Sequence, residues 1–152
     1  MEKEQFVQGM EANAEMLYRV AWTILRNEED SRDAVQEAAM KAWKKRYFLR
    51  NEEAFCSWIC RIVINCSYSI LRKRKQTVPL DAVAEPAVPP PDLTLNLLIQ
   101  SLPDKLRLPL MLSCAEGMTY REISLLLRLP LTTVTGRIRM AKETLRKELN
   151  EK

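Results

Sequence analysis

The stretch from Thr132 to Lys142 carries hydroxyl and cationic side chains at a helical spacing. With Val134 facing inward, about 100° per residue turns Thr132, Gly136 and Arg139 outward. Small residues and one long donor suit a helix that enters the DNA major groove, where an arginine can pair with guanine or a phosphate. The candidate DNA contacts are Thr132, Thr133, Thr135, Gly136, Arg137, Arg139 and Lys142. An ordinary amphipathic helical hairpin has the same spacing and stays open as the alternative.

Two helices and a turn must position these side chains. Thr119-Tyr-Arg-Glu122 has the pattern of a capping box that opens a short helix, and Arg128-Leu-Pro-Leu131 is typical of a turn. Thr132 or Thr133 then begins the last helix, whose apolar stripe is Val134, Ile138, Ala141, Leu145 and Leu149. A short capped helix, a turn and a longer helix predict a helix-turn-helix. Upstream, a helix near Leu93–Gln100 precedes a segment over 104–114, with Pro103 at its first helical position and Pro109 kinking it or delaying its start.

The first half of the chain predicts three more helices. Apolar residues from Phe6 to Leu25 recur every three to four positions, and Asn27 with Asp30 forms a weak N-terminal cap for a second helix from Glu28 to Lys45. Asn51 begins a third helix, which the pattern expects to bury Phe55, Trp58, Ile59, Ile62, Cys66 and Ile70.

Strand-like alternation is missing from the sequence, so the predicted fold class is all-α. Residues 77–92 hold five of the eight prolines and show no amphipathic period, which is typical of a semi-extended linker. We therefore expect a three-helix domain over 1–76, a Pro-rich linker over 77–92 and a helix-turn-helix domain over 93–152.

Composition excludes most enzyme classes and most cofactors. The chain has no histidine and only 3 glycines, so it lacks the commonest general base, the commonest zinc ligand and any glycine-rich phosphate loop. Its cysteines, Cys56, Cys60, Cys66 and Cys114, form no C-x-x-C pair, and we interpret them as small buried hydrophobes and not as a metal or redox site. No bound metal or cofactor is expected.

No apolar run approaches the roughly 20 residues of a membrane span, and the charged start, Met1 to Glu4, lacks the apolar segment of a signal peptide. The cytoplasm is the expected compartment, without insertion into a membrane.

Charge is distributed unevenly along the chain. Residues 1–37 carry 9 acidic and 4 basic side chains, whereas residues 38–75 carry 2 acidic and 10 basic ones. Residues 93–152 are again basic, with 10 basic against 6 acidic side chains. Two basic segments and one acidic segment suggest two contacts with a polyanion and a separate contact with a protein. Solvated helix faces are the alternative explanation.

Several motifs together resemble the extracytoplasmic-function (ECF) group of bacterial sigma-70 family RNA polymerase sigma factors. In the second half these are Leu102-Pro-Asp-Lys-Leu-Arg107, Gly117-Met-Thr-Tyr-Arg-Glu-Ile123 and Leu129-Pro-Leu-Thr-Thr-Val-Thr-Gly-Arg-Ile-Arg-Met-Ala-Lys142. In the first half they are Asp33-Ala-Val-Gln-Glu37 with Ala42-Trp43, and Trp58 with Ile62, Asn65 and Arg72. The resemblance covers nearly the whole chain in the family's order, with a linker where the family has one.

Four positions depart from the family's pattern. Arg128 replaces a turn glycine, so a left-handed conformation there would be strained. Thr135 and Gly136 stand where the family often has Lys-Ser, Ser69 replaces a usual aspartate, and Pro109 is unusual in its helix. We expect the Gly136 departure to alter the preferred −35 sequence or to permit a closer backbone approach to DNA.

The resemblance implies two sites in the first domain. Asp33, Gln36 and Glu37 on the second helix would dock on the clamp helices of the polymerase β′ subunit. The loop over 47–51 and the exposed side of the third helix would face the −10 element, where aromatic rings and arginines stack on unpaired bases and Asn can bond their edges. These candidates are Tyr47, Phe48, Arg50, Asn51, Arg61, Asn65, Tyr68 and Arg72. Packing of Tyr47 and Phe48 on the core is the alternative, and Trp58 is expected in the core.

The implied partners are core RNA polymerase, through its β′ clamp helices and β flap, promoter DNA and an anti-sigma factor. The implied function is a non-enzymatic subunit that recognises −10 and −35 elements and opens the −10 strand. A helix-turn-helix regulator that never engages polymerase is the main alternative, and a helical protein-interaction adaptor is a second. An enzymatic function would require chemistry that uses no histidine, no glycine-rich loop and no clustered cysteines.

Overall fold

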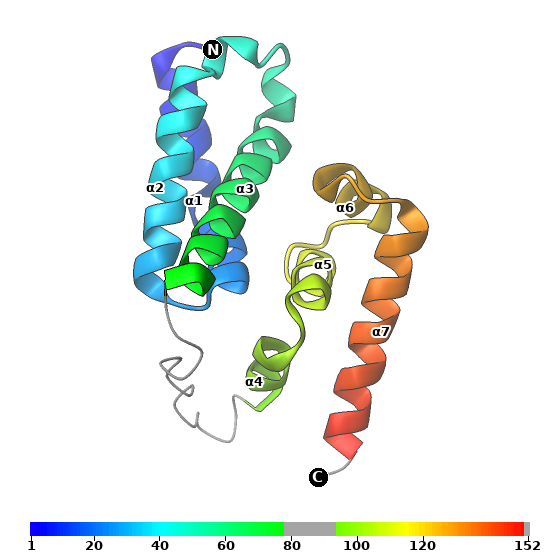
Figure 1. The fold of residues 1–152 in the computed structure, drawn as a ribbon. Helices are drawn as coiled ribbons and strands as arrows, with labels where there is room; N and C mark the ends of the chain where they lie inside the picture. Colours follow the sequence, from blue (N-terminus) through cyan, green and yellow to red (C-terminus); the bar gives the residue numbers. More distant parts are fainter. Residues whose placement is uncertain (78–93, 151–152) are drawn as a thin grey trace. The chain divides into compact units, whose positions relative to one another are not determined.

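The computed structural model describes residues 1–77 and 94–150. These residues contain helices and no strand, which confirms the all-α prediction. The chain divides into two compact units, Met1–Arg74 and Lys75–Lys152 (Figure 1). The predicted linker, residues 77–92, lies outside the described residues except for Thr77, which is the last residue of the third long helix.

Three long helices lie alongside one another in the first unit (Figure 1): α1 (Lys3–Leu25), α2 (Glu28–Lys44) and α3 (Phe55–Thr77). Two short 3₁₀ turns, η1 (Arg46–Phe48) and η2 (Glu52–Ala54), connect α2 to α3. The core-facing side of α2 consists of small residues that let its backbone approach α1 closely: Ser31, Ala34, Ala38 and Ala42. The predicted cap is confirmed, since Asn27 Oδ1 accepts a 2.7 Å hydrogen bond from the Asp30 N–H.

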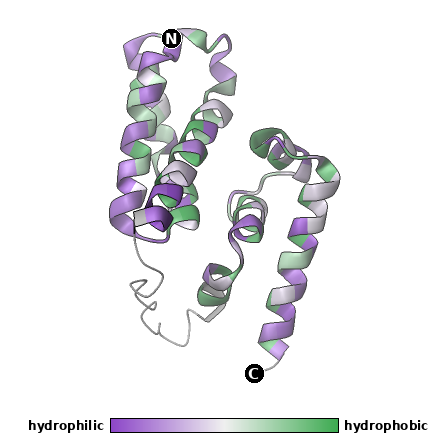
Figure 2. Ribbon diagram, viewed as in Figure 1, coloured by the Kyte–Doolittle hydropathy of each residue, from purple (hydrophilic) through white to green (hydrophobic). Residues whose placement is uncertain are grey.

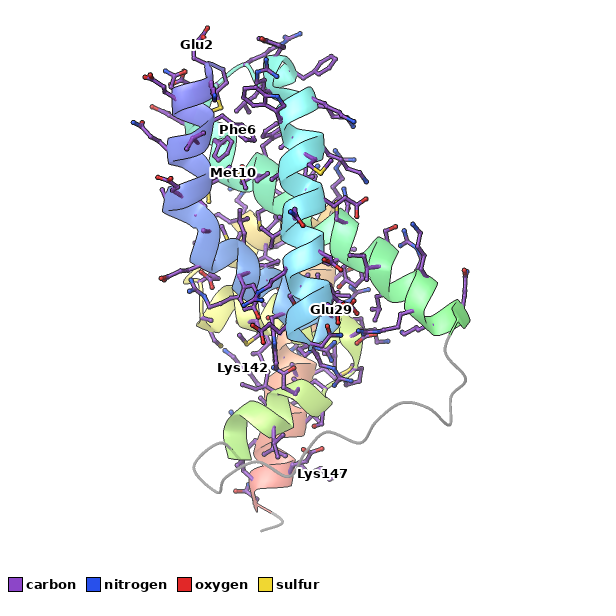
Figure 3. All side chains as sticks on the ribbon, turned by 90° about the vertical axis from the view of Figure 1, so that its left-hand side faces the viewer. Glu2, Phe6, Met10, Glu29, Lys142 and Lys147 are labelled. Carbon is purple, nitrogen blue, oxygen red and sulfur yellow. The ribbon has the colours of Figure 1, made fainter. Side chains whose placement is uncertain are left out.

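An aromatic cluster closes one end of this unit, next to the loop between α2 and α3. Phe6 of α1, labelled in Figure 3, meets the rings of Trp43 and Phe55 edge-on at centroid distances of 5.3 and 5.8 Å. Gly9 makes this approach possible, because a Cβ atom there would lie 2.6 Å from the Phe55 ring. The cluster therefore anchors both ends of the loop, since Trp43 precedes it and Phe55 follows it.

The opposite end is held by an arginine from the basic run that ends α3. Arg74 Nη1 lies 2.8 Å from Asp30 Oδ2, and its Nη2 donates to the Leu25 carbonyl at 3.1 Å. This side chain connects the end of α1 and the start of α2 to α3. Arg74 is therefore a structural residue, although its sequence neighbours are the exposed cations Arg72 and Lys73.

The buried face of α3 differs from the predicted one. Trp58, Ile62 and Ile70 are only half-buried, whereas Cys60, Val63, Ile64, Ser67 and Leu71 are buried beside the correctly predicted Phe55, Ile59 and Cys66. The buried face is thus turned by roughly 80° round the helix, at about 100° per residue. The prediction centred the face on the bulkiest side chains, but smaller residues occupy its middle. Val35 and Trp43, the larger apolar residues of α2, are half-buried.

One stretch of the described residues, Glu52–Gln76, is long and apolar enough to cross a membrane by length and composition. This finding corrects the expectation that no apolar stretch approaches the length of a membrane span. This stretch contains all of α3 except its last residue, and the buried face of α3 is part of the core of the first unit. A core helix of a protein that does not enter a membrane meets the same criteria.

The cysteine prediction is half correct. Cys60 and Cys66 are buried, and burial raises the pKa of the Cys66 thiol, which keeps it protonated and unreactive. Cys56 and Cys114 are exposed, contrary to the prediction. Within residues 1–77 and 94–150, no group of histidine, cysteine or acidic side chains is arranged to hold a metal ion.

The second unit consists of α4 (Thr94–Ser101), α5 (Asp104–Cys114), α6 (Tyr120–Leu127) and α7 (Leu131–Asn150). Helices α5 and α6 both pack on α7. Pro103 is the N-terminal cap of α5 and not its first helical residue. Pro109 neither ends nor delays this helix, which continues through it, because the ring is buried among apolar neighbours that offset the lost hydrogen bond.

A buried arginine fixes the start of α5. Arg107 is 2% exposed, and its guanidinium donates to the Leu102 carbonyl at 2.8 Å and to Asp104 Oδ1 at 2.6 Å. Partial burial raises the pKa of Asp104, but the hydrogen bonds from its cationic partners, Arg107 first, outweigh it and hold this pKa below its ordinary value. The arginine of the Leu-Pro-x-x-x-Arg motif therefore serves the fold of this unit.

The helix-turn-helix has the predicted order of elements. Thr119 and Glu122 form the predicted capping box of α6, and Arg128 after it has the left-handed conformation, with φ of 55°. Helix α7 begins at Leu131, directly after Pro130, and so one or two residues earlier than predicted. Val134, Ile138, Ala141 and Leu145 are buried as predicted, but Leu149 is exposed, because it lies in the last turn of α7.

Replacing Arg128 by glycine should stabilise the second unit by about 1 kcal/mol, because a non-glycine residue in the left-handed region has an unfavourable Cβ contact. Urea unfolding followed by circular dichroism measures this change. The Arg128→Ala variant is the matched control, since it removes the same side chain but keeps Cβ. A glycine variant no more stable than the alanine variant would show that the turn is not strained.

Candidate nucleic-acid interface

Two aromatic side chains project from the loop between α2 and α3. The exposed fractions of Tyr47 and Phe48 are 71% and 80%, so the alternative in which they pack on the core is wrong. Exposure of an apolar phenylalanine ring to water is unfavourable, and its flat face is available to stack on another flat group. Arg50 and Asn51, the other two candidates in this loop, are exposed as well.

Arg46 holds Tyr47 in place, and the sequence reading did not select it. Its guanidinium carbon lies 3.6 Å from the centroid of the Trp43 ring and 4.3 Å from that of the Tyr47 ring. The same guanidinium donates to the Trp43 carbonyl and to the Tyr47 hydroxyl, each at 2.7 Å. Trp43, Arg46 and Tyr47 thus form a stack that begins at the aromatic cluster and ends at an exposed tyrosine. The spacing of these residues, three and four positions after Trp43, was the signal available in the sequence.

Asn51 has a structural contact that competes with its candidate role. Its Oδ1 atom accepts a 3.0 Å hydrogen bond from the Glu53 N–H, so the side chain caps the short turn η2. This confirms Asn51 as the residue that starts the third helical segment, although that segment begins with a 3₁₀ turn and becomes α-helical at Phe55. A loss of function in an Asn51 variant would therefore mix a capping effect with a binding effect.

The other first-unit candidates form one stripe along α3. Arg61, Asn65, Tyr68 and Arg72 are spaced four, three and four residues apart. Asn65 and Arg72 are exposed, and Arg61 and Tyr68 are half-buried. Because the buried face of α3 is turned away from its predicted position, this stripe lies almost opposite the core, at about 100° per residue. The structure thus presents two arginines, an amide and a phenol on one outward face.

The candidate docking residues lie on the exposed side of α2. Asp33, Gln36 and Glu37 are all exposed, and the visible face of this helix is mostly hydrophilic in Figure 2. Glu37 pairs with Lys41 at 3.2 Å, and this hydrogen bond raises the pKa of Lys41. Met40 lies one turn after Gln36 and is 61% exposed, an apolar residue that the sequence reading did not include. Methionine is enriched at protein contacts relative to the rest of the surface.

None of the predicted recognition residues lies in the buried stripe of α7. Some lie on the side opposite this stripe, and the others lie at its edges. Thr132, Arg139 and Lys142 are exposed, the last being labelled in Figure 3, and the remaining four candidates are half-buried: Thr133, Thr135, Gly136 and Arg137. The Thr135 hydroxyl donates to the Leu131 carbonyl at 2.9 Å, which leaves its oxygen as the group able to accept from a ligand. Leu131 and Met140 are exposed apolar residues on the same helix that are not among the predicted contacts.

Comparisons with known proteins agree with this arrangement. Residues 10–77 match the family Sigma-70 region 2, and residues 93–145 match Sigma-70, region 4. The ECF RNA polymerase sigma factor SigW of Bacillus subtilis is 25% identical over 99% of this chain and 91% of that protein. The RNA polymerase sigma-H factor of Pseudomonas aeruginosa is 31% identical over 80% of this chain and 74% of that protein.

Solved structures show the same fold. The sigma factor RpoE of Bartonella quintana, solved with the anti-sigma factor NepR, superposes with a TM-score of 0.79 over 95% of this chain and 96% of its own, at 23% identity. CnrH, solved with the cytosolic domain of CnrY, superposes with a TM-score of 0.74 over 99% of this chain and 90% of its own, at 22% identity. The family matches and the sequence relatives together show that this chain belongs to the ECF group of sigma-70 family RNA polymerase sigma factors, a non-enzymatic family that directs transcription initiation.

Proposed function

We propose that this chain binds core RNA polymerase and directs it to promoters by recognising a −10 and a −35 element and by opening the −10 strand. In this proposal, residues 1–76 bind polymerase and the −10 element, residues 93–152 bind the −35 element, and residues 77–92 link them. The observation that carries it is the exposed pair Tyr47 and Phe48, of which Tyr47 is held by Arg46 against the aromatic cluster. A regulator that reads only duplex DNA has no use for two exposed rings.

Opening of the −10 strand follows from differential binding. An unpaired base presents its flat face to Tyr47 or Phe48, whereas a base inside the duplex is stacked on its neighbours and cannot do so. The phosphates beside the captured base would contact Arg50 of the same loop, and Arg61 and Arg72 along α3 would contact phosphates further along the strand. Asn65 and Tyr68 would supply hydrogen bonds. A protein that binds the open strand better than the duplex shifts the equilibrium toward opening without ATP.

Polymerase docking uses a different surface. The exposed acidic side of α2, with Asp33, Gln36 and Glu37, would contact the clamp helices of the polymerase β′ subunit, with Met40 as an apolar contact among them. The β flap of the enzyme would contact the second unit. Separation of the acidic surface from the cationic stripe of α3 permits protein and DNA to be bound at once.

Recognition of the −35 element rests on α7. Arg139 is exposed on the outward side of this helix, so replacing it by alanine should weaken −35-dependent transcription by about 1–3 kcal/mol if it pairs with a base edge. The matched control is Arg139→Lys, which keeps the charge but cannot form the bidentate contact. Transcript yields from promoters with the preferred and a scrambled −35 element measure both variants. A lysine variant as active as the wild type would identify a phosphate contact, and an active alanine variant would remove Arg139 from the site.

We further propose that an anti-sigma factor covers the two DNA-binding surfaces and that the chain acts in the cytoplasm without entering a membrane. Support comes from RpoE, which was solved with its anti-sigma factor NepR. An amphipathic helix laid against the exposed side chains of α3 or α7 would exclude DNA from them.

Transcription start mapping tests the proposal. The chain is added to core RNA polymerase on fragments of genomic DNA, and the 5′ ends of the transcripts are sequenced. The expected result is a set of new start sites that share two upstream sequence elements. A chain that binds duplex DNA but creates no new start sites would be a regulator and would overturn the proposal.

A further inference from the structure

The fold does not explain one of the three glycines. Gly9 is needed because a Cβ atom would meet the Phe55 ring at 2.6 Å, and Gly117 has φ of 66°, a conformation that glycine favours. Gly136, inside α7, has neither reason: a Cβ atom built there meets nothing within 4 Å, and its φ is not positive. Glycine inside a helix destabilises it relative to alanine. Neither packing nor backbone conformation therefore accounts for a glycine at this position, which directs attention to what the helix binds.

The neighbours of Gly136 describe the ligand surface. On a helix, residues three and four positions apart are adjacent, so Gly136 lies between Thr132 and Thr133 on one side and Arg139 and Met140 on the other. Met140 is 54% exposed. Without a Cβ atom at position 136, the side-chain surface between these neighbours lacks one methyl group. The position thus accepts a group of about that size, beside a thioether and threonine methyl groups.

A phosphate does not suit this position. The N–H of Gly136 already donates along the helix to the carbonyl four residues earlier, so no backbone donor is available there. An apolar group does suit it, and the major-groove edges of the four base pairs carry only one, the C5-methyl group of thymine. We propose that Gly136 accommodates a thymine methyl group and makes thymine the required base at one position of the −35 element. This inference rests on the proposed function, in which α7 enters the major groove.

The inference is tested by adding a methyl group to the protein at position 136 and removing one from the DNA. The holoenzyme, formed from core RNA polymerase and the full chain, first selects its preferred −35 element from a randomised library. Each thymine of that element is then replaced singly by deoxyuridine, which lacks only the C5-methyl group. Promoter binding by the wild type and by the Gly136→Ala variant is measured on every DNA, and urea unfolding of the free variant is measured in parallel.

We expect the effect of the Gly136→Ala substitution to depend on the methyl group of one particular thymine. Gly136→Ala should weaken binding to the thymine promoter by about tenfold, and deoxyuridine at that one position should restore it to within about threefold of the wild type. Deoxyuridine at the other thymines is the matched control and should restore nothing. The variant should also unfold at a higher urea concentration, so that weaker binding cannot be attributed to a damaged helix.

Three other outcomes overturn the inference. If Gly136→Ala binds all promoters as the wild type does, the glycine has no role in DNA recognition. If binding falls equally on thymine and deoxyuridine DNA, the added methyl group disturbs something other than a thymine contact. If the wild-type holoenzyme selects no −35 element, the proposed function itself fails, and this result is distinguishable because it precedes any variant.

Discussion

Alanine at both Tyr47 and Phe48 should lower transcription from a fully duplex promoter by about 5- to 150-fold. This range corresponds to about 1–3 kcal/mol for one base stacked on an aromatic side chain. The loss should be within about threefold on a template whose −10 region is already unpaired downstream of the captured base. Stacking contributes only once the base has left the duplex, so the variant should form closed complexes normally and open ones poorly.

Aromatic exchange is the matched control for this prediction. The double variant Tyr47→Phe and Phe48→Tyr keeps both rings and should retain most activity on both templates. Both side chains are exposed, so neither double variant is expected to lose helix content, which circular dichroism verifies. Equal loss of activity on the duplex and the pre-melted template would mean that the loop supports polymerase docking instead of strand opening.

Reversal of two charges on α2 should have an effect of similar or greater size on a different step. With lysine at Asp33 and Glu37, affinity for core RNA polymerase should fall by about 2–5 kcal/mol, because the reversed charges would oppose the partner's own. The reversal also replaces the pair between Glu37 and Lys41 by a repulsion, which costs the helix only about 0.4–1 kcal/mol. Fluorescence anisotropy of the labelled chain, titrated with core enzyme, measures the affinity.

The exposed acids of α1 provide a control of equal charge. Lysine at Glu11 and Glu15 changes the net charge by the same amount on another helix, and polymerase affinity should stay within about threefold of the wild type. If the α2 variant binds core enzyme as tightly as the α1 variant does, α2 is not the docking surface. If both variants lose affinity equally, net charge and not a specific surface governs the association.

Local signals in the sequence predicted the elements well. Asn27 caps α2 and Thr119 caps α6 because each side-chain oxygen bonds an N–H group within three residues, so neither contact depends on the rest of the fold. The left-handed conformation of Arg128 was indicated by the family resemblance, which has a glycine at this turn, and not by a local signal. The start of α7 was less accurate, since Pro130 precedes the helix and the two threonines that resemble caps lie inside it.

Contacts between distant residues could not be predicted in this way. The basic run that ends α3 contains four cations in a row, and of these Arg74 bonds Asp30 and the Leu25 carbonyl. Only the packing of the three helices determines which of the four makes these contacts. The buried face of α3 was misplaced because many apolar residues lie round this helix. Periodicity alone does not show which of them face α1 and α2. Arg46 was missed for a different reason: its contacts with Trp43 and Tyr47 are local, but its role depends on both rings together.

Permanganate reactivity at a mapped start site tests strand opening by this chain most directly. Permanganate oxidises unpaired thymines, so it reports an open −10 region without any transcript being made. With core polymerase and the chain together, and with no nucleotide present, we expect reactive non-template thymines at the −10 element. Core polymerase alone and the chain alone should give none. A promoter that is bound by the chain and polymerase yet stays unreactive would contradict the account.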